Sequence, residues 1–247
     1  PLYVATVDPA GGILSSWRLT DYTDHREWVA DLVASPTSGL FQLALLTDQG
    51  RIDLRDVPFQ IESARIDGRD RVTLTTANPS GWSLRLEYTF ATEQYSALVD
   101  LQANGLSRGT DLEIIFPHGL PRLEKTAKTD EQSSATLAFV ENSFIKHRGQ
   151  KKPGWSATES GTVQWVGARS KYFLAAAIFE SGTQGIYEAH SEGEESETHV
   201  RTSVRIPLGE PGGPPLSFRL YAGPLELHRL EKYEAGLDRA VDLGWKP

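Results

Sequence analysis

The 247-residue sequence contains neither cysteine nor methionine. Without cysteine the chain can form no disulfide, no thiolate zinc site and no thiol nucleophile. Position 1 is proline rather than methionine, so we expect a fragment of a longer chain. The longest apolar run, Tyr172 to Phe179, is far shorter than the roughly 20 residues that a membrane helix needs. The sequence therefore predicts no membrane-spanning segment within these residues.

Positive charge is also scarce, because the formal net charge is −8 and the isoelectric point is about 5.3. The chain as a whole lacks the field that attracts nucleic acid or anionic lipid, so we expect neither as a partner. The one basic cluster comprises Lys146, His147, Arg148, Lys151 and Lys152. It has no interleaved aromatics for base stacking and is predicted to be a solvated loop. Close to a bilayer, the same residues could meet anionic head groups.

The dominant periodicity of the sequence is two. From Trp82 to Phe90, large apolar residues alternate with polar ones, which predicts a strand with one buried and one exposed face. Several other segments show the same alternation, around residues 71–75, 95–101, 200–206 and 216–220. Such segments are typical of half-buried antiparallel strands.

Two segments, Asp111 to Phe116 and Tyr172 to Phe179, are apolar on both faces and are predicted to be central strands. Turn signals such as Asp67-Gly68 and Asn104-Gly105 separate the strands, at spacings that suit hairpins. No gap fits the helix of a parallel crossover. The sequence therefore predicts an all-β, antiparallel sandwich.

Two helices are predicted within this β framework. The spacing of Trp28, Val29, Leu32 and Val33 predicts a short surface helix from Asp24 to Val33, with Asp24 as its cap. A second helix of about a dozen residues is predicted near the C-terminus. Pro224 is expected in its first turn, an apolar stripe on its buried face, and Gly236 at its end. The stripe consists of Leu227, Leu230, Tyr233 and Leu237, interrupted by Glu234.

Candidate catalytic patterns are few. Gly105 to Gly109 matches the G-x-S-x-G pattern of hydrolase nucleophile elbows, but it joins two predicted strands instead of a strand and a helix. His190 and His199 bracket an acidic run that could ligate a divalent ion, although a solvated loop is the preferred interpretation. His118 follows a predicted strand and could act as a general base, but a turn histidine is favoured. We predict no metal, no cofactor and no catalytic residue.

Three segments in order along the chain resemble the periplasmic domain of YidC-type membrane protein insertases. Asp8 to Trp17 resembles the Gly-Gly strand that opens that domain. Trp165-Val166-Gly167 with Lys171 to Ala176 is similar to the family's W-x-G and K-Y-F segment. Tyr221-Ala222-Gly223-Pro224 and Leu237 to Trp245 resemble its close, which ends in Gly244-Trp245. The match spans about residues 2 to 245.

The resemblance implies a β-supersandwich similar to galactose mutarotase, with a terminal helix packed on the sheet. It implies one domain, with residues 1–223 as the supersandwich and residues 224–247 as the helix and the connection to an absent transmembrane core. It also implies a non-catalytic role at the periplasmic face of the bacterial inner membrane, in insertion and folding of membrane proteins. The expected partners are the insertase core, Sec translocon accessory subunits and nascent membrane proteins.

The C-terminal end is the predicted contact region, because it must bury its stripe and deliver the chain to the membrane. The candidate interface residues are Pro224, Leu227, Leu230, Tyr233, Leu237, Gly244 and Trp245. His118 and Trp165 are candidates for lining a cleft. Two alternatives stay open on the same fold, an aldose epimerase-like enzyme and a carbohydrate-binding module.

Overall fold

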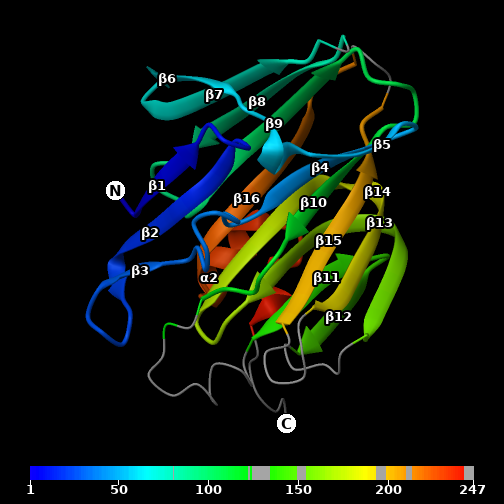
Figure 1. Ribbon diagram of the computed structural model, residues 1–247. Coiled ribbons are helices and arrows are strands. Elements are labelled where there is room, and N and C mark those ends of the chain that lie inside the picture. The colour runs from blue at the N-terminus through cyan, green and yellow to red at the C-terminus, as the bar shows by residue number, and fades with distance from the viewer. Residues whose placement is uncertain are drawn as a thin grey trace.

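A computed structural model of the protein describes residues 1–79, 81–121, 123, 134–148, 154–192, 199–209 and 213–241. Two antiparallel sheets dominate these residues (Figure 1). The smaller sheet has the order β1-β2-β3 and consists of β1 (Tyr3–Asp8), β2 (Ile13–Thr23) and β3 (Val29–Asp31). The predicted all-β, antiparallel architecture is confirmed.

The larger sheet has thirteen strands, ten of which follow the order β5-β4-β10-β15-β14-β16-β9-β8-β7-β6. At β14 a branch leads through β13 and β11 to β12. The first strands of this sheet are β4 (Gln42–Thr47), β5 (Gly50–Asp53), β6 (Gln60–Ile66), β7 (Arg69–Ala77), β8 (Ser83–Phe90) and β9 (Ser96–Asn104). The others are β10 (Asp111–Phe116), β11 (Ala135–Val140), β12 (Ser143–Arg148), β13 (Ser156–Arg169), β14 (Phe173–Glu192), β15 (His199–Pro207) and β16 (Leu216–Pro224).

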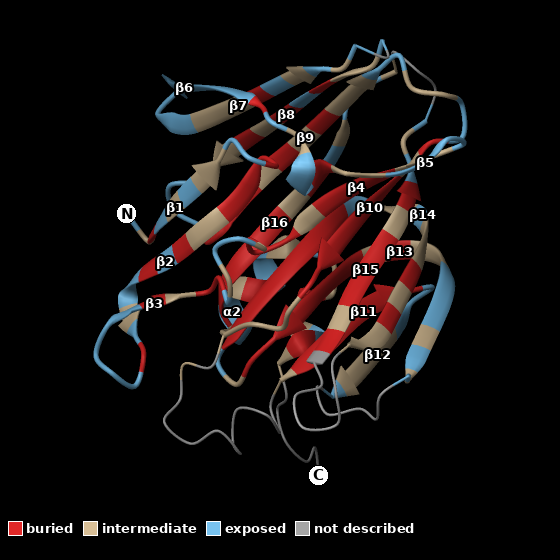
Figure 2. Cartoon of the chain, in the orientation of Figure 1, coloured by how far each residue is buried: buried red, intermediate tan, exposed pale blue. Residues whose placement is uncertain are grey.

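The predicted alternation of apolar and polar residues matches the observed alternation of buried and exposed side chains. In β8, Leu84, Leu86 and Tyr88 are buried while Arg85 between them is exposed. Strands β10 and β14 are central, and each has a run of consecutive buried residues, as their sequences predict (Figure 2). These runs are buried because other elements cover both faces of the large sheet there.

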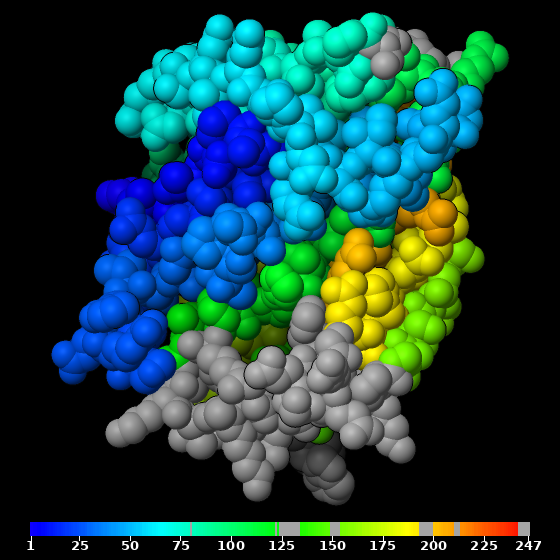
Figure 3. Space-filling model, in the orientation of Figure 1, coloured from blue at the N-terminus to red at the C-terminus, as the bar shows by residue number. Residues whose placement is uncertain are grey.

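The small sheet closes the core from one side (Figure 3). Trp17 of β2 is fully buried and stacks on Tyr3 of β1 with ring centroids 4.1 Å apart. Its indole N–H donates to the carbonyl oxygen of Ala222 in β16 at 2.8 Å. Trp17 thus fastens the small sheet to the central strand β16 of the large one.

The predicted helix from Asp24 to Val33 is wrong, since these residues form the β2–β3 hairpin. The Asp24 carboxylate accepts hydrogen bonds from the backbone N–H groups of Arg26 and Trp28 at 2.8 and 3.1 Å, which stabilises a turn instead of a helix. Glu27 completes the turn with a φ of 65°. The apolar spacing predicted one buried helix face that includes Trp28 and Leu32, but only Leu32 is buried and Trp28 is exposed.

The basic cluster is also not a loop where the structure describes it. Lys146, His147 and Arg148 lie in β12, which pairs with β11, whereas Lys151 and Lys152 fall outside the described residues. Across the described part of the chain, no helix is long and apolar enough to cross a membrane.

Candidate functional site

The C-terminal cap, residues 225–241, leaves the end of β16 and packs against the sheets. It contains the one-turn helix α2 (Leu227–Leu230) and the 3-10 turns η2 (Glu231–Tyr233) and η3 (Leu237–Ala240). The predicted helix of a dozen residues is therefore wrong in length, although the segment is helical in short pieces. Glu234 and Gly236 adopt left-handed conformations, with φ of 52° and 71°, and interrupt the helix at both positions.

The cap starts later than predicted. Pro224 is the last residue of β16 and pairs with Phe173 of β14, so it is not in a helical turn. Leu225 then donates its backbone N–H to the carbonyl oxygen of Tyr172 at 2.7 Å, and Glu226 is the N-cap of α2. The exit from β16 is thus fixed by the turn between β13 and β14.

The apolar stripe predicted for this segment is mostly buried. Leu230 and Leu237 are fully buried and Tyr233 is half-buried, with its ring 5.2 Å from that of Tyr221. Leu227, by contrast, is 36% exposed and faces solvent. The cap therefore presents an apolar side chain outward while it is anchored by the others. Gly244 and Trp245 lie outside the described residues.

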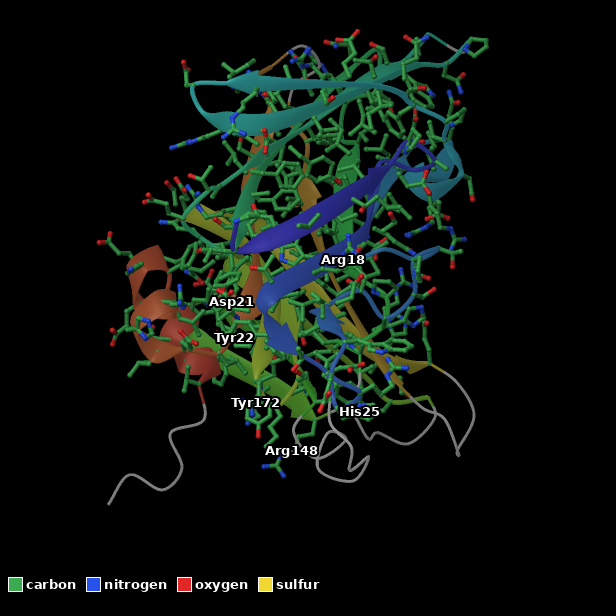
Figure 4. All side chains as sticks on the ribbon, turned by 90° about the vertical axis from the view of Figure 1, so that its left-hand side faces the viewer. Arg18, Asp21, Tyr22, His25, Arg148 and Tyr172 are labelled. Carbon is green, nitrogen blue, oxygen red and sulfur yellow. The ribbon has the colours of Figure 1, made fainter. Side chains whose placement is uncertain are left out.

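Polar contacts fasten the cap to the strand β2, whose Tyr22 lies beside the cap in Figure 4. The Tyr22 hydroxyl donates to Oε1 of Glu226 at 2.7 Å, and Arg229 donates from Nε to Oε2 of the same carboxylate. The Arg229 guanidinium also lies 5.2 Å from the centre of the Tyr95 ring. Burial would raise the pKa of Glu226, but the hydrogen bonds from Tyr22 and Arg229 outweigh it and lower that pKa. Glu226 is thus held as an anion between two elements.

A buried arginine holds the far end of the cap. Arg169, the last residue of β13, is 7% exposed and donates from Nη1 to the carbonyl oxygen of Ala240 at 2.6 Å. Arg239 stacks over Phe139 of β11 at 4.8 Å. Together with the Tyr22 contact, these interactions tie the cap to β2, β11 and β13. It is a fixed part of the fold.

The two predicted cleft residues are not brought together. His118 is half-buried after β10, and its Nε2 lies 3.2 Å from the hydroxyl of Ser38. Trp165 is fully buried in β13, where its ring lies 6.0 Å from Phe144. Trp165 therefore lines no cleft open to solvent, and that prediction is wrong. Exposure of a tryptophan in a strand cannot be read from its neighbours in sequence.

The G-x-S-x-G pattern lies in the connection between β9 and β10, as predicted. Ser107 donates to Oδ1 of Asp48 at 2.8 Å. A Cβ at Gly105, whose φ is 72°, would overlap the carbonyl oxygen of Gly81 and lie 3.1 Å from Cα of Trp82. The β9–β10 connection therefore passes so close to the β7–β8 connection that position 105 requires glycine. No nucleophile elbow is needed to account for this residue.

His190 and Glu192 form the shortest described contact between imidazole and carboxylate, at 3.0 Å. Both lie in β14, so these two residues are not in a loop, and residues 193–198 of the acidic run lie outside the described residues. Arg201 also approaches Glu192, at 3.3 Å. Burial would raise the pKa of Glu192, but His190 and Arg201 outweigh it and lower that pKa. Such a paired anion is a poor proton donor at neutral pH.

Among the residues that the structure describes, no three His, Asp or Glu side chains are grouped to hold a metal ion.

A surface groove of about 300 Å³ lies over β9, β14 and β16. Glu180 and Arg219 in its lining form an ion pair, and Phe179 and Phe218 are its aromatic residues. The described lining contains no histidine. The described lining therefore offers no histidine beside the Glu180 carboxylate for proton transfer.

Sequence reasoning missed two groups of residues. One group fixes the cap, and the other consists of two exposed aromatic residues. Tyr22, Glu226 and Arg229 have no pattern in sequence that relates them, because Tyr22 and Glu226 are 204 residues apart. Trp28 and Tyr172 are 64% and 47% exposed. Tyr172 stands in the K-Y-F segment, which was the available signal for it.

Comparison with known proteins agrees with this architecture. The model of the family described as "YidC periplasmic domain" matches residues 1–246. Relatives described as "Membrane protein insertase YidC" include that of Chlorobaculum tepidum, which is 27% identical over 258 residues, and that of Chlorobium luteolum, which is 28% identical over 258 residues. Each alignment covers 99% of this chain and 44% of the relative, so the chain spans less than half the length of these relatives.

Among solved structures, the chain is similar to the ligand-free alpha-N-acetylgalactosaminidase NagBb from Bifidobacterium bifidum, with a TM-score of 0.60. The two chains are 12% identical, and the match covers 98% of this chain and 38% of that one. It is also similar to a galactose mutarotase related enzyme from Lactobacillus acidophilus, with a TM-score of 0.54 and 9% identity over 90% and 95% of the two chains. At such identities the likeness concerns the fold alone. The predicted galactose-mutarotase-like fold is confirmed.

Proposed function

The chain belongs to the YidC periplasmic domain family, and on that premise we propose that it is a non-catalytic domain that positions a membrane protein insertase through its C-terminal cap. We place it at the periplasmic face of the bacterial inner membrane. Its proposed partners are the insertase's own transmembrane core, Sec translocon accessory subunits and nascent membrane proteins. In this role the domain assists insertion and folding, alone or with the Sec translocon.

The observation that carries this proposal is the rigid attachment of the cap. The cap has little helix of its own, and a single helical turn is not stable in isolation. Contacts from β2, β11 and β13 hold it instead. A segment fixed in this way transmits the orientation of the whole sandwich to whatever it contacts, and Leu227 offers an exposed apolar contact there.

A chimera tests the proposal. In the insertase of Chlorobaculum tepidum, the segment that matches residues 1–246 is replaced by this chain, and insertion of a reporter membrane protein is measured in cells depleted of their own insertase. We expect the chimera to insert the reporter. The double change Leu230→Ala and Leu237→Ala is expected to detach the cap and reduce insertion, because each truncation removes a fully buried side chain.

The matched control changes apolar residues far from the cap. Ile61→Ala and Ile66→Ala alter β6, whose residues are all exposed, and should leave insertion unchanged. Protease resistance of each purified variant separates a detached cap from a failure to fold. A detached cap with full insertion would overturn the proposed role of the cap.

A sugar-active protein is the second candidate, because the fold is shared with sugar enzymes and a surface groove is present. Mutarotation of α-glucose or α-galactose, followed by optical rotation, tests the enzyme. We expect no acceleration by the purified chain. Glycan-array binding tests the carbohydrate-binding module, and we expect no specific sugar at micromolar affinity.

A further inference from the structure

The tip of the β2–β3 hairpin holds an exposed tryptophan in a fixed position. Trp28 is 64% exposed, and the guanidinium of Arg26 lies 4.4 Å from the centre of its ring. Asp24, which is 8% exposed, binds the backbone N–H groups of both residues and forms an ion pair with Arg26 at 2.7 Å. Glu27 between them has a φ of 65°, an unfavourable conformation for this residue type. The turn therefore holds Trp28 out in solvent.

A second exposed aromatic has its own cation. Tyr172 is 47% exposed in the turn between β13 and β14, and Nζ of Lys171 lies 4.5 Å from the centre of its ring. Two backbone hydrogen bonds fix this turn, from Leu225 to Tyr172 at 2.7 Å and from Ser170 to Phe173 at 2.9 Å. Like Trp28, Tyr172 is therefore presented by rigid backbone.

Both turns lie at the same end of the molecule. In Figure 4, His25 of the hairpin, Tyr172 and the exposed Arg148 at the end of β12 all lie towards the lower end. In Figure 1, the β2–β3 connection and the end of β12 point the same way, and β6 lies at the opposite end. We call this lower end, with Arg26, Trp28, Arg148, Lys171 and Tyr172, the aromatic end.

We propose that the aromatic end rests on the surface of a phospholipid bilayer that contains anionic lipid. Tryptophan and tyrosine suit the level of the head groups, because one part of each side chain is apolar and another part is polar. Each ring has a cation beside it, with Arg26 also paired to Asp24, and Arg148 at the same end is exposed, so cationic groups meet the anionic head groups there. The chain as a whole is acidic, so an anionic surface repels its other faces and favours this orientation.

A protein partner is less well matched by these residues. Protein interfaces concentrate their binding energy in a central, well-packed cluster of hot spots. The aromatic end offers two cation–aromatic pairs on separate turns, which suits a fluid surface that adapts to both. The inference rests on the proposed function only for the presence of a membrane near the domain.

Vesicle binding by the purified 247-residue chain tests this inference. We expect cosedimentation with vesicles that contain phosphatidylglycerol and much weaker binding to vesicles of phosphatidylcholine alone. Trp28→Ala and Tyr172→Ala should each weaken binding about fivefold to tenfold, and Lys171→Gln about fivefold. With brominated lipids, the quenching seen for the parent should fall in Trp28→Phe to the level that the five other tryptophans contribute.

The matched control is the β6 pair, Ile61→Ala and Ile66→Ala, which removes exposed apolar groups at the opposite end and should bind as the parent does. Absence of vesicle binding, or equal binding by all variants, overturns the inference. If the parent does not bind vesicles but Trp28→Ala reduces insertion by the chimera, the aromatic end contacts a protein. Vesicle binding with an inactive chimera would instead count against the proposed function alone.

Discussion

The hydroxyl of Tyr22 donates a hydrogen bond of 2.7 Å to the carboxylate of Glu226, across 204 residues of sequence. This contact joins the second strand of the chain to the residue that opens α2. Arg229 binds the other oxygen of the same carboxylate. The orientation of the cap therefore depends on a carboxylate shared by an N-terminal strand and the cap itself.

Tyr22→Phe removes this hydrogen bond and leaves the ring in place. We expect the free energy of unfolding to fall by about 1 kcal/mol, the usual net value of a hydrogen bond, with slightly more for a charged acceptor. Urea unfolding measures the change. Tyr172→Phe is the control, since its side chain is half exposed and should change stability by less than about 0.5 kcal/mol. Equal effects of the two changes would show that the Tyr22 contact contributes nothing.

The cap should loosen in acid. Because the pKa of Glu226 is lowered in the folded protein, its contribution to stability is fully present above the ordinary value of 4.5 and is lost as the pH falls through the lowered pKa. We expect Glu226→Gln to be less stable than the parent at about pH 7 and the difference to shrink towards about pH 3. Glu231→Gln, at an exposed neighbour, controls for the loss of one negative charge. A difference independent of pH would contradict the assignment.

Trp17→Phe should be among the most damaging conservative changes. It leaves a cavity in a fully buried position and removes the hydrogen bond to Ala222. We expect a loss of about 3 kcal/mol in the free energy of unfolding. Trp28→Phe, at the exposed hairpin tip, should stay within about 0.5 kcal/mol of the parent. Comparable losses in the two variants would show that the small sheet is not fastened through Trp17.

Gly167 belongs to the W-x-G segment, and the structure explains it by packing. A Cβ there would overlap the carbonyl oxygen of Ala175 and lie 2.8 Å from Cα of Ala176, both in the paired strand β14. Since paired backbone cannot move aside easily, we expect Gly167→Ala to cost about 1 to 3 kcal/mol. Gly119→Ala is the control, because nothing lies within 4 Å of its Cβ position. Thermal unfolding of both variants measures the contrast.

The strands could be predicted from sequence because burial of one face imposes a period of two. The alternation from Trp82 to Phe90 corresponds to β8, and the doubly apolar segments correspond to β10 and β14. The resemblance to the insertase family rested on three separated segments, and the family match covers residues 1–246. Both predictions used information that is local in sequence.

The two helix predictions were wrong because apolar spacing alone does not show where the backbone turns. Near Trp28, the Asp24 carboxylate binds backbone N–H groups in a turn, and the same residue would also suit a helix cap. In the cap, Leu230 and Leu237 are buried as a continuous helix would bury them, yet Glu234 and Gly236 reverse the chain locally. Short turns can bury the same residues as a helix of equal length.

The contacts of the candidate site could not be predicted from sequence because they join distant residues. No pattern links Tyr22 to Glu226, or Arg169 to the carbonyl of Ala240. Exposure of aromatics was equally hidden, since Trp165 is buried and Trp28 is exposed. Only the folded arrangement separates the side chains that pack in the core from those that are exposed to solvent.

Site-specific photo-crosslinking in the chimera tests the central proposal most directly. A photoreactive residue replaces Leu227, the exposed apolar residue of the cap, and in a second variant it replaces Ile61 of β6. We predict crosslinks from position 227 to the membrane-embedded part of the insertase, away from the covalent junction, and none from position 61. The same crosslinks from both positions, or none from position 227, would contradict the proposal that the cap is the contact surface.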